Sequence, residues 1–117
     1  MVTPAAGAVV LVPFPFSNLA HAKLRPAVVL ADAGRGDWIL CQITSNPYAD
    51  PRAVELTATC FAQGSLRITS YARPGKLFTA SQELIVSQSG TLSTAAFQVL
   101  IESVIHLLQT SLAVEIH

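Results

Sequence analysis

Three cations precede a proline and an apolar run in the segment HAKLRPAVVL, residues 21–30. Pro26 restricts Arg25 to an extended or turn backbone and donates no ladder hydrogen bond, so we expect Arg25 at a loop-to-strand junction. The apolar run predicts a rigid, buried strand, which is the support that a positioned guanidinium needs. The alternative interpretation is an arginine that is only solvated or paired with a carboxylate.

Hydroxyl groups follow the next predicted strand. Alternation in DWILCQITS, residues 37–45, places Gln42 and Thr44 on one face of that strand. Thr44 and Ser45 then offer two hydroxyls at the strand end, just before Asn46, and such a set suits a hydrogen-bonded anion. The same residues before a proline are equally typical of turn chemistry.

A third polar group lies in SLRITSYARPGKLFTA, residues 65–80. Tyr71, Arg73 and Lys76 surround a predicted Pro-Gly turn. A tyrosine beside two cations could stack an unpaired base while the cations meet phosphate. Aromatic and cationic residues at a turn are also common on inert surfaces, so this alternative stays open.

Other catalytic patterns do not occur in the sequence: it has no GxSxG, GxxxxGK[ST], HExxH or CxxC. Of the three dispersed histidines, only His21 is near the other candidates in the sequence, and a loop histidine is often just solvated. Cys41 and Cys60 are expected to be reduced core thiols. We therefore predict no metal and no cofactor.

The elements that must position these groups are short apolar runs separated by turn residues. Length and β-branched content favour strands, and we expect them at residues 8–14, 26–32, 37–45, 53–57, 65–72, 76–80 and 83–88. The glycine-rich AGRG between the second and third runs predicts an antiparallel hairpin.

The period changes after Thr91, where apolar residues recur at helical spacing. The expected apolar face contains Phe97, Leu100, Ile101, Val104, Leu107 and Leu108. Gly90 should end the preceding strand, and Thr91 or Ser93 should cap the helix. Many strands followed by one amphipathic helix predict a mainly-β fold, a small, strongly bent barrel with a C-terminal helix.

Composition limits the partners. A chain of 117 residues suits one domain, 1–117, and seven Lys and Arg balance seven Asp and Glu. No global field therefore exists to coat nucleic acid. Only 12% of the residues are charged, so we expect apolar surface to be buried against another chain.

No run approaches the about 20 apolar residues of a membrane span, which predicts a cytoplasmic protein without membrane contact.

Taken together, GAVVLVPFPFSNLAHAKLRPAVVL, ILCQITS and GSLRITSYARPGKLFTA, followed by an amphipathic helix, resemble the MazF/PemK family of toxin ribonucleases. The resemblance covers nearly the whole chain. It implies an SH3-like barrel that forms a homodimer, cleaves single-stranded RNA without a metal, and is neutralised by a cognate antitoxin.

The resemblance also implies roles for individual residues. The family's functional arginine falls on Arg25 and its strand-end threonine on Thr44, with Ser45 beside it. These groups would stabilise the charge that develops when a ribose 2′-hydroxyl attacks the adjacent phosphodiester. The expected RNA contacts are Lys23, Asn46, Tyr71, Arg73 and Lys76.

One departure concerns the general base. Some family members carry an acidic residue near the position of SYARPGK, and this chain has none there. His21 is then a candidate base and Lys76 a candidate acid or phosphate clamp. The alternative function is an SH3-like binding module that has kept the barrel and lost the chemistry.

Overall fold

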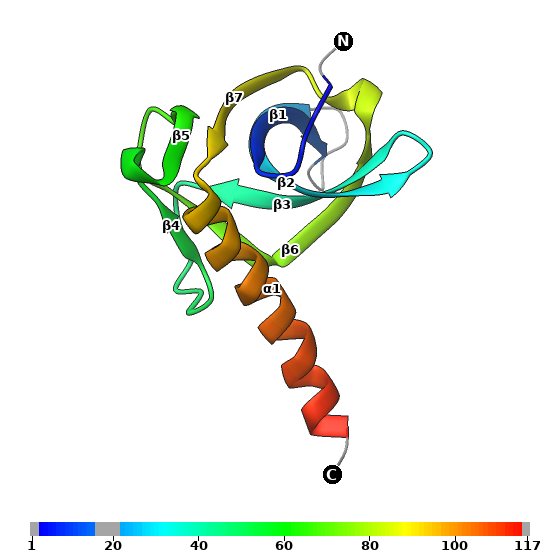
Figure 1. The fold of residues 1–117 in the computed structure, drawn as a ribbon, viewed down its shortest axis with the longest axis vertical. Coiled ribbons are helices and arrows are strands. Elements are labelled where there is room, and N and C mark those ends of the chain that lie inside the picture. The colour runs from blue at the N-terminus through cyan, green and yellow to red at the C-terminus, as the bar shows by residue number, and fades with distance from the viewer. Residues whose placement is uncertain (1–2, 16–21, 116–117) are drawn as a thin grey trace.

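Seven strands and one long helix make up the computed structural model, which describes residues 3–15 and 22–115. In chain order the elements are β1 (Ala8–Pro15), β2 (Ala22–Gly34), β3 (Asp37–Thr44), β4 (Val54–Leu56), the 3-10 helix η1 (Ala58–Cys60), β5 (Phe61–Gly64), β6 (Ser70–Ser81), the 3-10 helix η2 (Gln82–Leu84), β7 (Ser87–Leu92) and α1 (Thr94–Glu115). The strands form one antiparallel sheet in the order β4-β6-β3-β2-β1-β7-β5. The sheet curls into a half-barrel on which α1 packs (Figure 1), so the predicted fold class is confirmed.

Apolar side chains cover both faces of the central strands. The cluster under α1 consists of Val9, Val28, Leu30, Cys41, Ile43, Leu56, Ala72, Leu92, Leu100 and Val104. The cluster on the other face, which we call the inner cluster, consists of Ala8, Val10, Val12, Ala27, Val29, Leu40, Ala80 and Ile85. A slip of one residue would exchange the two sets, so burial fixes the register of these strands.

The second strand is longer than its sequence predicts. β2 begins at Ala22, so Arg25 lies inside a strand and not at a loop-to-strand junction. Pro26 is accommodated because it pairs with Leu11 of β1, while the ladder to β3 ends one residue later at Ala27. The missing N–H of Pro26 therefore interrupts no bond toward β3. The predicted hairpin between β2 and β3 is present.

The Pro-Gly turn predicted between residues 72 and 76 is wrong. β6 runs without a break through Pro74 and Gly75, and residues 65–69 are irregular instead of extended. The β3–β6 register jumps from Cys41–Leu77 to Ile43–Ala72, so the intervening residues form a bulge. A bulge has unpaired backbone positions, which lets the strand contain a buried proline without losing a ladder bond.

The predicted strand 83–88 is also displaced, because η2 occupies its start and β7 follows. Gly90 lies inside β7 and does not end it. A Cβ atom at Gly90 would come within 2.5 Å of the carbonyl oxygen of Gln63 in β5, a strand that the sequence did not predict. Glycine is therefore needed here for the close approach of two strands.

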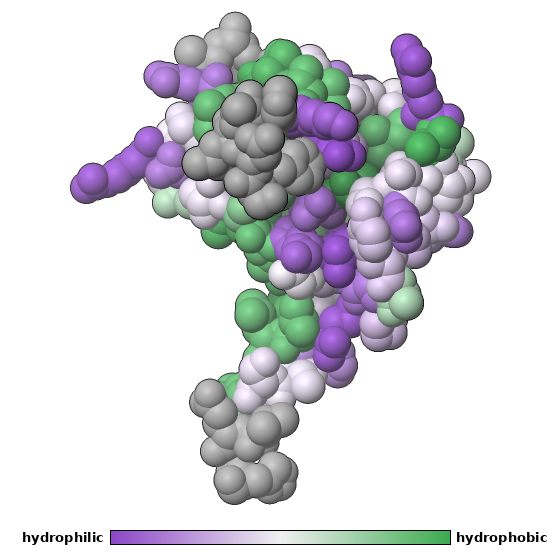
Figure 2. All heavy atoms as spheres, turned by 180° about the vertical axis from the view of Figure 1, so that it is seen from behind, coloured by the Kyte–Doolittle hydropathy of each residue, from purple (hydrophilic) through white to green (hydrophobic). Residues whose placement is uncertain are grey.

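Helix α1 begins as expected, since the Oγ of Ser93 accepts a hydrogen bond from the amide of Ala96 at 3.1 Å. Leu100 and Val104 are buried against the sheet. Leu108, predicted on the same face, is 61% exposed because the helix continues past the barrel (Figure 1). Figure 2 shows an apolar patch where the helix leaves the barrel.

This helix corrects one expectation about membranes. Within residues 3–15 and 22–115, the segment Thr94–Leu112 is long and apolar enough to cross a bilayer by length and composition, with a mean hydropathy of 1.3. The face with Leu100 and Val104 already lies in the core of the barrel. Length and composition alone therefore do not distinguish this helix from a membrane span.

The two cysteines should differ in reactivity. Burial raises the pKa of the Cys41 thiol to about 12, and its Sγ donates a hydrogen bond to the carbonyl oxygen of Arg73 at 3.1 Å. Because the thiolate is the nucleophile, iodoacetamide at neutral pH should label Cys60 first and Cys41 only after denaturation. Peptide mass spectrometry measures both rates. Equal labelling of the native protein would contradict the assigned register of β3.

Candidate functional site

Cross-strand pairing lines up three polar residues, and the register of β2 and β3 points to a fourth. The β2–β3 ladder ends at Ala27–Gln42; if its register continued for two more residues, Arg25 would stand opposite Thr44. Thr44 pairs with Tyr71 of β6, and Tyr71 pairs with Glu55 of β4. We call Arg25, Thr44, Tyr71 and Glu55 the polar row. Directly opposed residues share a face of the sheet, and their Cβ atoms are about 4.5–5.5 Å apart.

The polar row borders the inner cluster. Arg25 pairs with Val12 of β1, and Val12 belongs to that cluster. Arg25 and Thr44 are half-buried, whereas Glu55 is exposed. The Nε atom of Arg25 is shielded from solvent. The guanidinium and the hydroxyl thus lie between a dry interior and the surface, where the low dielectric strengthens their interaction with an anion.

The hydroxyl of Thr44 also organises the loop that follows it. Its Oγ1 accepts a hydrogen bond from the amide of Asn46 at 3.2 Å, and Oδ1 of Asn46 accepts one from the amide of Tyr48 at 2.9 Å. Thr44 and Asn46 thus form the turn hydrogen bonds that one of the two alternative interpretations predicts. Because an accepting hydroxyl retains its proton, Thr44 can still donate to a ligand. Ser45 is exposed beside it.

The predicted RNA-binding cations have different surroundings. Lys23 and Lys76 are exposed, on β2 and β6. Arg73 is held by an ion pair, in which its Nε lies 3.1 Å from Oδ2 of Asp50. The amide of Arg52 and the hydrogen bond from Arg73 lower the pKa of Asp50, so the carboxylate stays charged at neutral pH. The charge of Arg73 is thus partly compensated.

The predicted site residues do not all gather in one place. The structure pairs Thr44 with Tyr71, with Ser45 and Asn46 following Thr44, and Arg25 lies on β2 two residues before the last β2–β3 pair. Arg73 and Lys76 belong to the bulged part of β6. His21 lies outside the described residues.

Two residues of interest were missed by the sequence reasoning. Glu55 supplies a carboxylate, whereas the sequence predicts none near SYARPGK. Its position depends on the pairing of β4 with β6, which no local sequence pattern reveals. Tyr48 is 65% exposed, and its ring centroid lies 5.5 Å from Cζ of Arg73. An aromatic residue in a loop beside Asn46 and two prolines was the available signal for Tyr48.

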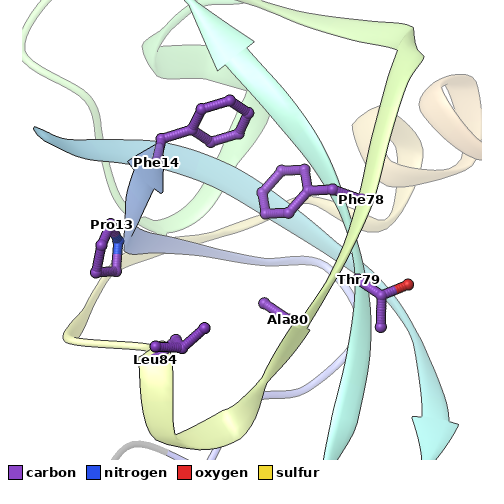
Figure 3. Close-up of a pocket in the computed structure, with 6 residues that line it drawn as sticks. All are labelled: Pro13, Phe14, Phe78, Thr79, Ala80 and Leu84. Carbon is purple, nitrogen blue, oxygen red and sulfur yellow. The ribbon is translucent and has the colours of Figure 1, made fainter. Parts of the chain in front are cut away.

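An apolar cavity of about 280 Å³ opens on the same side of the sheet as the polar row. Its lining consists of Pro13, Phe14, Phe78, Thr79, Ala80 and Leu84. The rings of Phe14 and Phe78 meet edge to face with centroids 5.0 Å apart. Figure 3 shows both rings at the cavity, with Thr79 pointing away from it. Phe14 pairs with Lys23 across β1 and β2, which places a cation next to an aromatic surface.

The chemistry available to this arrangement is anion stabilisation with proton transfer. A guanidinium and a hydroxyl donate to an oxyanion, and a carboxylate two strands from Thr44 accepts a proton. Among the described side chains, no group of three His, Cys, Asp or Glu comes together in a way that could hold a metal ion.

Comparison with known proteins gives a consistent result. The model for the PemK-like, MazF-like toxin of type II toxin-antitoxin systems matches residues 5–108. No curated protein matches the chain in sequence.

Several solved structures share the fold. A MazE–MazF complex from Deinococcus radiodurans has a TM-score of 0.74 at 19% identity, covering 93% of this chain and 98% of that chain. An endoribonuclease in complex with its cognate antitoxin, from a Mycobacterial species, has a TM-score of 0.70 at 13% identity, covering 93% and 96%. The toxin MazF-mt6 of Mycobacterium tuberculosis has a TM-score of 0.67 at 16% identity, covering 87% and 96%.

The opposition of Arg25 and Thr44 can be tested by cross-linking. With both native cysteines replaced, the pair Arg25→Cys and Thr44→Cys should form a disulfide on mild oxidation, because directly opposed strand residues are within disulfide reach. The matched control is Leu24→Cys with Thr44→Cys, since Leu24 points to the other face of β2. Thiol titration and non-reducing electrophoresis measure the outcome. A disulfide in the control alone would contradict the register.

Proposed function

Because the chain belongs to the family of PemK-like, MazF-like toxins of type II toxin-antitoxin systems, we propose that it is a sequence-specific endoribonuclease. It cleaves single-stranded RNA, with messenger RNA as the expected target, needs no metal, and acts in the cytoplasm as the toxin of such a pair. The observation that supports the proposal is the β2–β3 register, because its continuation beyond Ala27–Gln42 puts Arg25 and Thr44 on one face of the sheet.

The proposed partners follow from the family. A cognate antitoxin would bind and neutralise the chain; the Mycobacterial endoribonuclease was solved in complex with its own cognate antitoxin. A second copy of the chain would form the homodimer. The exposed apolar residues of α1, among them Ile105, Leu108 and Leu112, support an interface with another chain.

The proposed reaction begins with attack of a ribose 2′-oxygen on the adjacent phosphorus. The new bond gives a 2′,3′-cyclic phosphate, and the bond to the 5′-oxygen breaks to give a 5′-hydroxyl. Negative charge builds on the non-bridging oxygens during this step. Arg25 meets that charge with a planar fork of donors, and the hydroxyls of Thr44 and Ser45 add further donors.

Two protons must move in this reaction. We assign acceptance of the 2′-hydroxyl proton to Glu55, because it is the carboxylate of the polar row and supplies the group that residues 70–76 lack. His21 is the alternative base. Lys76, exposed on β6, is the candidate donor to the departing 5′-oxygen, or a phosphate clamp. The remaining cation of β2, Lys23, with Asn46 and Tyr71, would hold the flanking nucleotides.

The aromatic cavity supports an RNA ligand. Single-stranded RNA is recognised largely through splayed bases that stack on aromatic side chains. Phe14 and Phe78 offer such a surface beside Lys23, on the side of the sheet that carries the polar row. Local cations then suffice for binding, which suits a chain with no net charge.

The rival is a binding module with the same barrel and no chemistry. Incubation of the purified chain with a mixed RNA pool in the presence of a chelator separates the two functions. Cleavage supports the nuclease, and binding without cleavage supports the module.

Loss of either oxyanion donor should slow cleavage strongly. Arg25→Ala and Thr44→Ala should each lower the single-turnover rate about 10²–10³-fold, roughly 2.7–4 kcal/mol of transition-state stabilisation. Circular dichroism must show that both variants still fold. An RNA with 2′-deoxyribose at the cut position should resist the parent enzyme, because the nucleophile is absent. Unchanged cleavage and growth arrest in both variants would remove this site.

The general base is tested by a matched pair of glutamates. Glu55→Gln should lower kcat about 10²–10⁴-fold, since an amide does not accept the proton. Glu83→Gln, in η2 and away from the polar row, serves as the control and should keep the parent rate. Quenched time courses of the cleavage of one defined RNA give kcat for both variants. If His21→Ala abolishes kcat and Glu55→Gln does not, the histidine is the base.

A further inference from the structure

The loop between β3 and β4 is unusually well defined by its own hydrogen bonds. Beyond the bonds at Thr44 and Asn46, the amide of Asp50 donates to the carbonyl oxygen of Pro47 at 2.9 Å. The amide of Arg52 donates to Oδ1 of Asp50 at 2.9 Å, and the amide of Ala53 to the carbonyl oxygen of Asp50 at 3.1 Å. These bonds stabilise the loop although it contains no regular element.

At the tip of this loop the backbone is strained. Tyr48 and Ala49 both have left-handed φ angles, of 53° and 56°. Left-handed backbone is unfavourable for residues that carry a Cβ, and it persists where surrounding contacts determine the conformation. Such strain gathers at ligand-binding sites. Here it turns one side chain, Tyr48, out of the loop.

The ring of Tyr48 is both exposed and supported. It is 65% exposed, yet Cζ of Arg73 lies 5.5 Å from its centroid, within the range of a cation–π contact. Arg73 is in turn held by Asp50 at 3.1 Å. One side of the ring thus has a fixed partner before any ligand arrives. The pKa of Asp50 is lowered, so its carboxylate stays charged at neutral pH. The ion pair that holds Arg73 beside the ring is therefore kept.

The link between the loop backbone and Thr44 suggests a role for this ring. The hydroxyl of Thr44 begins the chain of hydrogen bonds that ends at the amide of Tyr48. The backbone that carries the ring is therefore tied, through Asn46, to the group that we assign to the scissile phosphate.

We propose that Tyr48, supported by Arg73 and Asp50, is a stacking platform for the base of a nucleotide flanking the cut, and that it contributes to the RNA sequence preference. The proposal rests on the proposed nuclease function. Every base has a π face, so the platform contributes affinity for any base at that position. Its fixed orientation favours bases with a larger stacking area.

Two substitutions separate the ring from the shape of the loop. Tyr48→Asn removes the aromatic face, but asparagine adopts the left-handed conformation readily, so the loop should keep its backbone. Tyr48→Phe keeps the aromatic face and loses only the hydroxyl. Asp50→Asn weakens the hold on Arg73 and should give an intermediate effect.

The experiment uses the full chain and a randomised pool of short RNA oligonucleotides. Tyr48→Asn should raise KM about 5- to 150-fold, the range of one lost base–aromatic stack, with kcat within a few-fold of the parent. Sequencing of the cut ends should show relaxed preference at one flanking position. Tyr48→Phe should restore both properties. A parent-like KM and cut profile for Tyr48→Asn would overturn the platform.

Failure of the platform and failure of the nuclease remain distinguishable. If the parent cleaves nothing, the nuclease proposal fails, and binding of a pool of 2′-deoxy oligonucleotides by fluorescence anisotropy then tests the platform alone. Weaker binding by Tyr48→Asn, rescued by Tyr48→Phe, supports it. Equal binding of the oligonucleotides by all three proteins overturns the platform. It is also overturned if Tyr48→Asn binds the oligonucleotides like the parent and loses only the binding of a protein partner.

Discussion

The antiparallel ladder through β1, β2, β3 and β6 is the constraint on which the site depends. Side chains alternate between the faces of a strand, so only the register decides whether Arg25 and Thr44 share a face. The register is itself fixed by burial on both faces, with Val29 and Leu40 on one side and Val28 on the other. The positions of the polar residues are therefore set by apolar neighbours that take no part in any chemistry.

Features encoded by neighbouring residues were predictable, whereas features that depend on distant pairing were not. The alternation of β3 predicted the face of Thr44, and the glycine-rich turn predicted the β2–β3 hairpin. The Pro-Gly turn at Pro74 was wrong because pairing with β3 overrides a local turn preference and absorbs the proline in a bulge. Glu55 joins the polar row only through β4–β6 pairing, which leaves no mark in its own segment.

The unusual composition has a structural explanation. A sheet that is buried on both faces uses apolar residues at nearly every position of its central strands, so few positions remain for charge. The projecting end of α1 carries further apolar residues, which raises the apolar share of the chain. Periodicity predicted which side of α1 is apolar, but not how far the barrel extends beneath it, and Leu108 is exposed for that reason.

The loop that carries Tyr48 is joined to the sheet by few side chains, chiefly Thr44 and Arg73. Its other internal bonds are made by its own residues. Insertions or exchanges in this segment would therefore leave the ladder and both clusters undisturbed. The segment that would meet a base can therefore vary during evolution without disturbing the strands that hold Arg25 and Thr44.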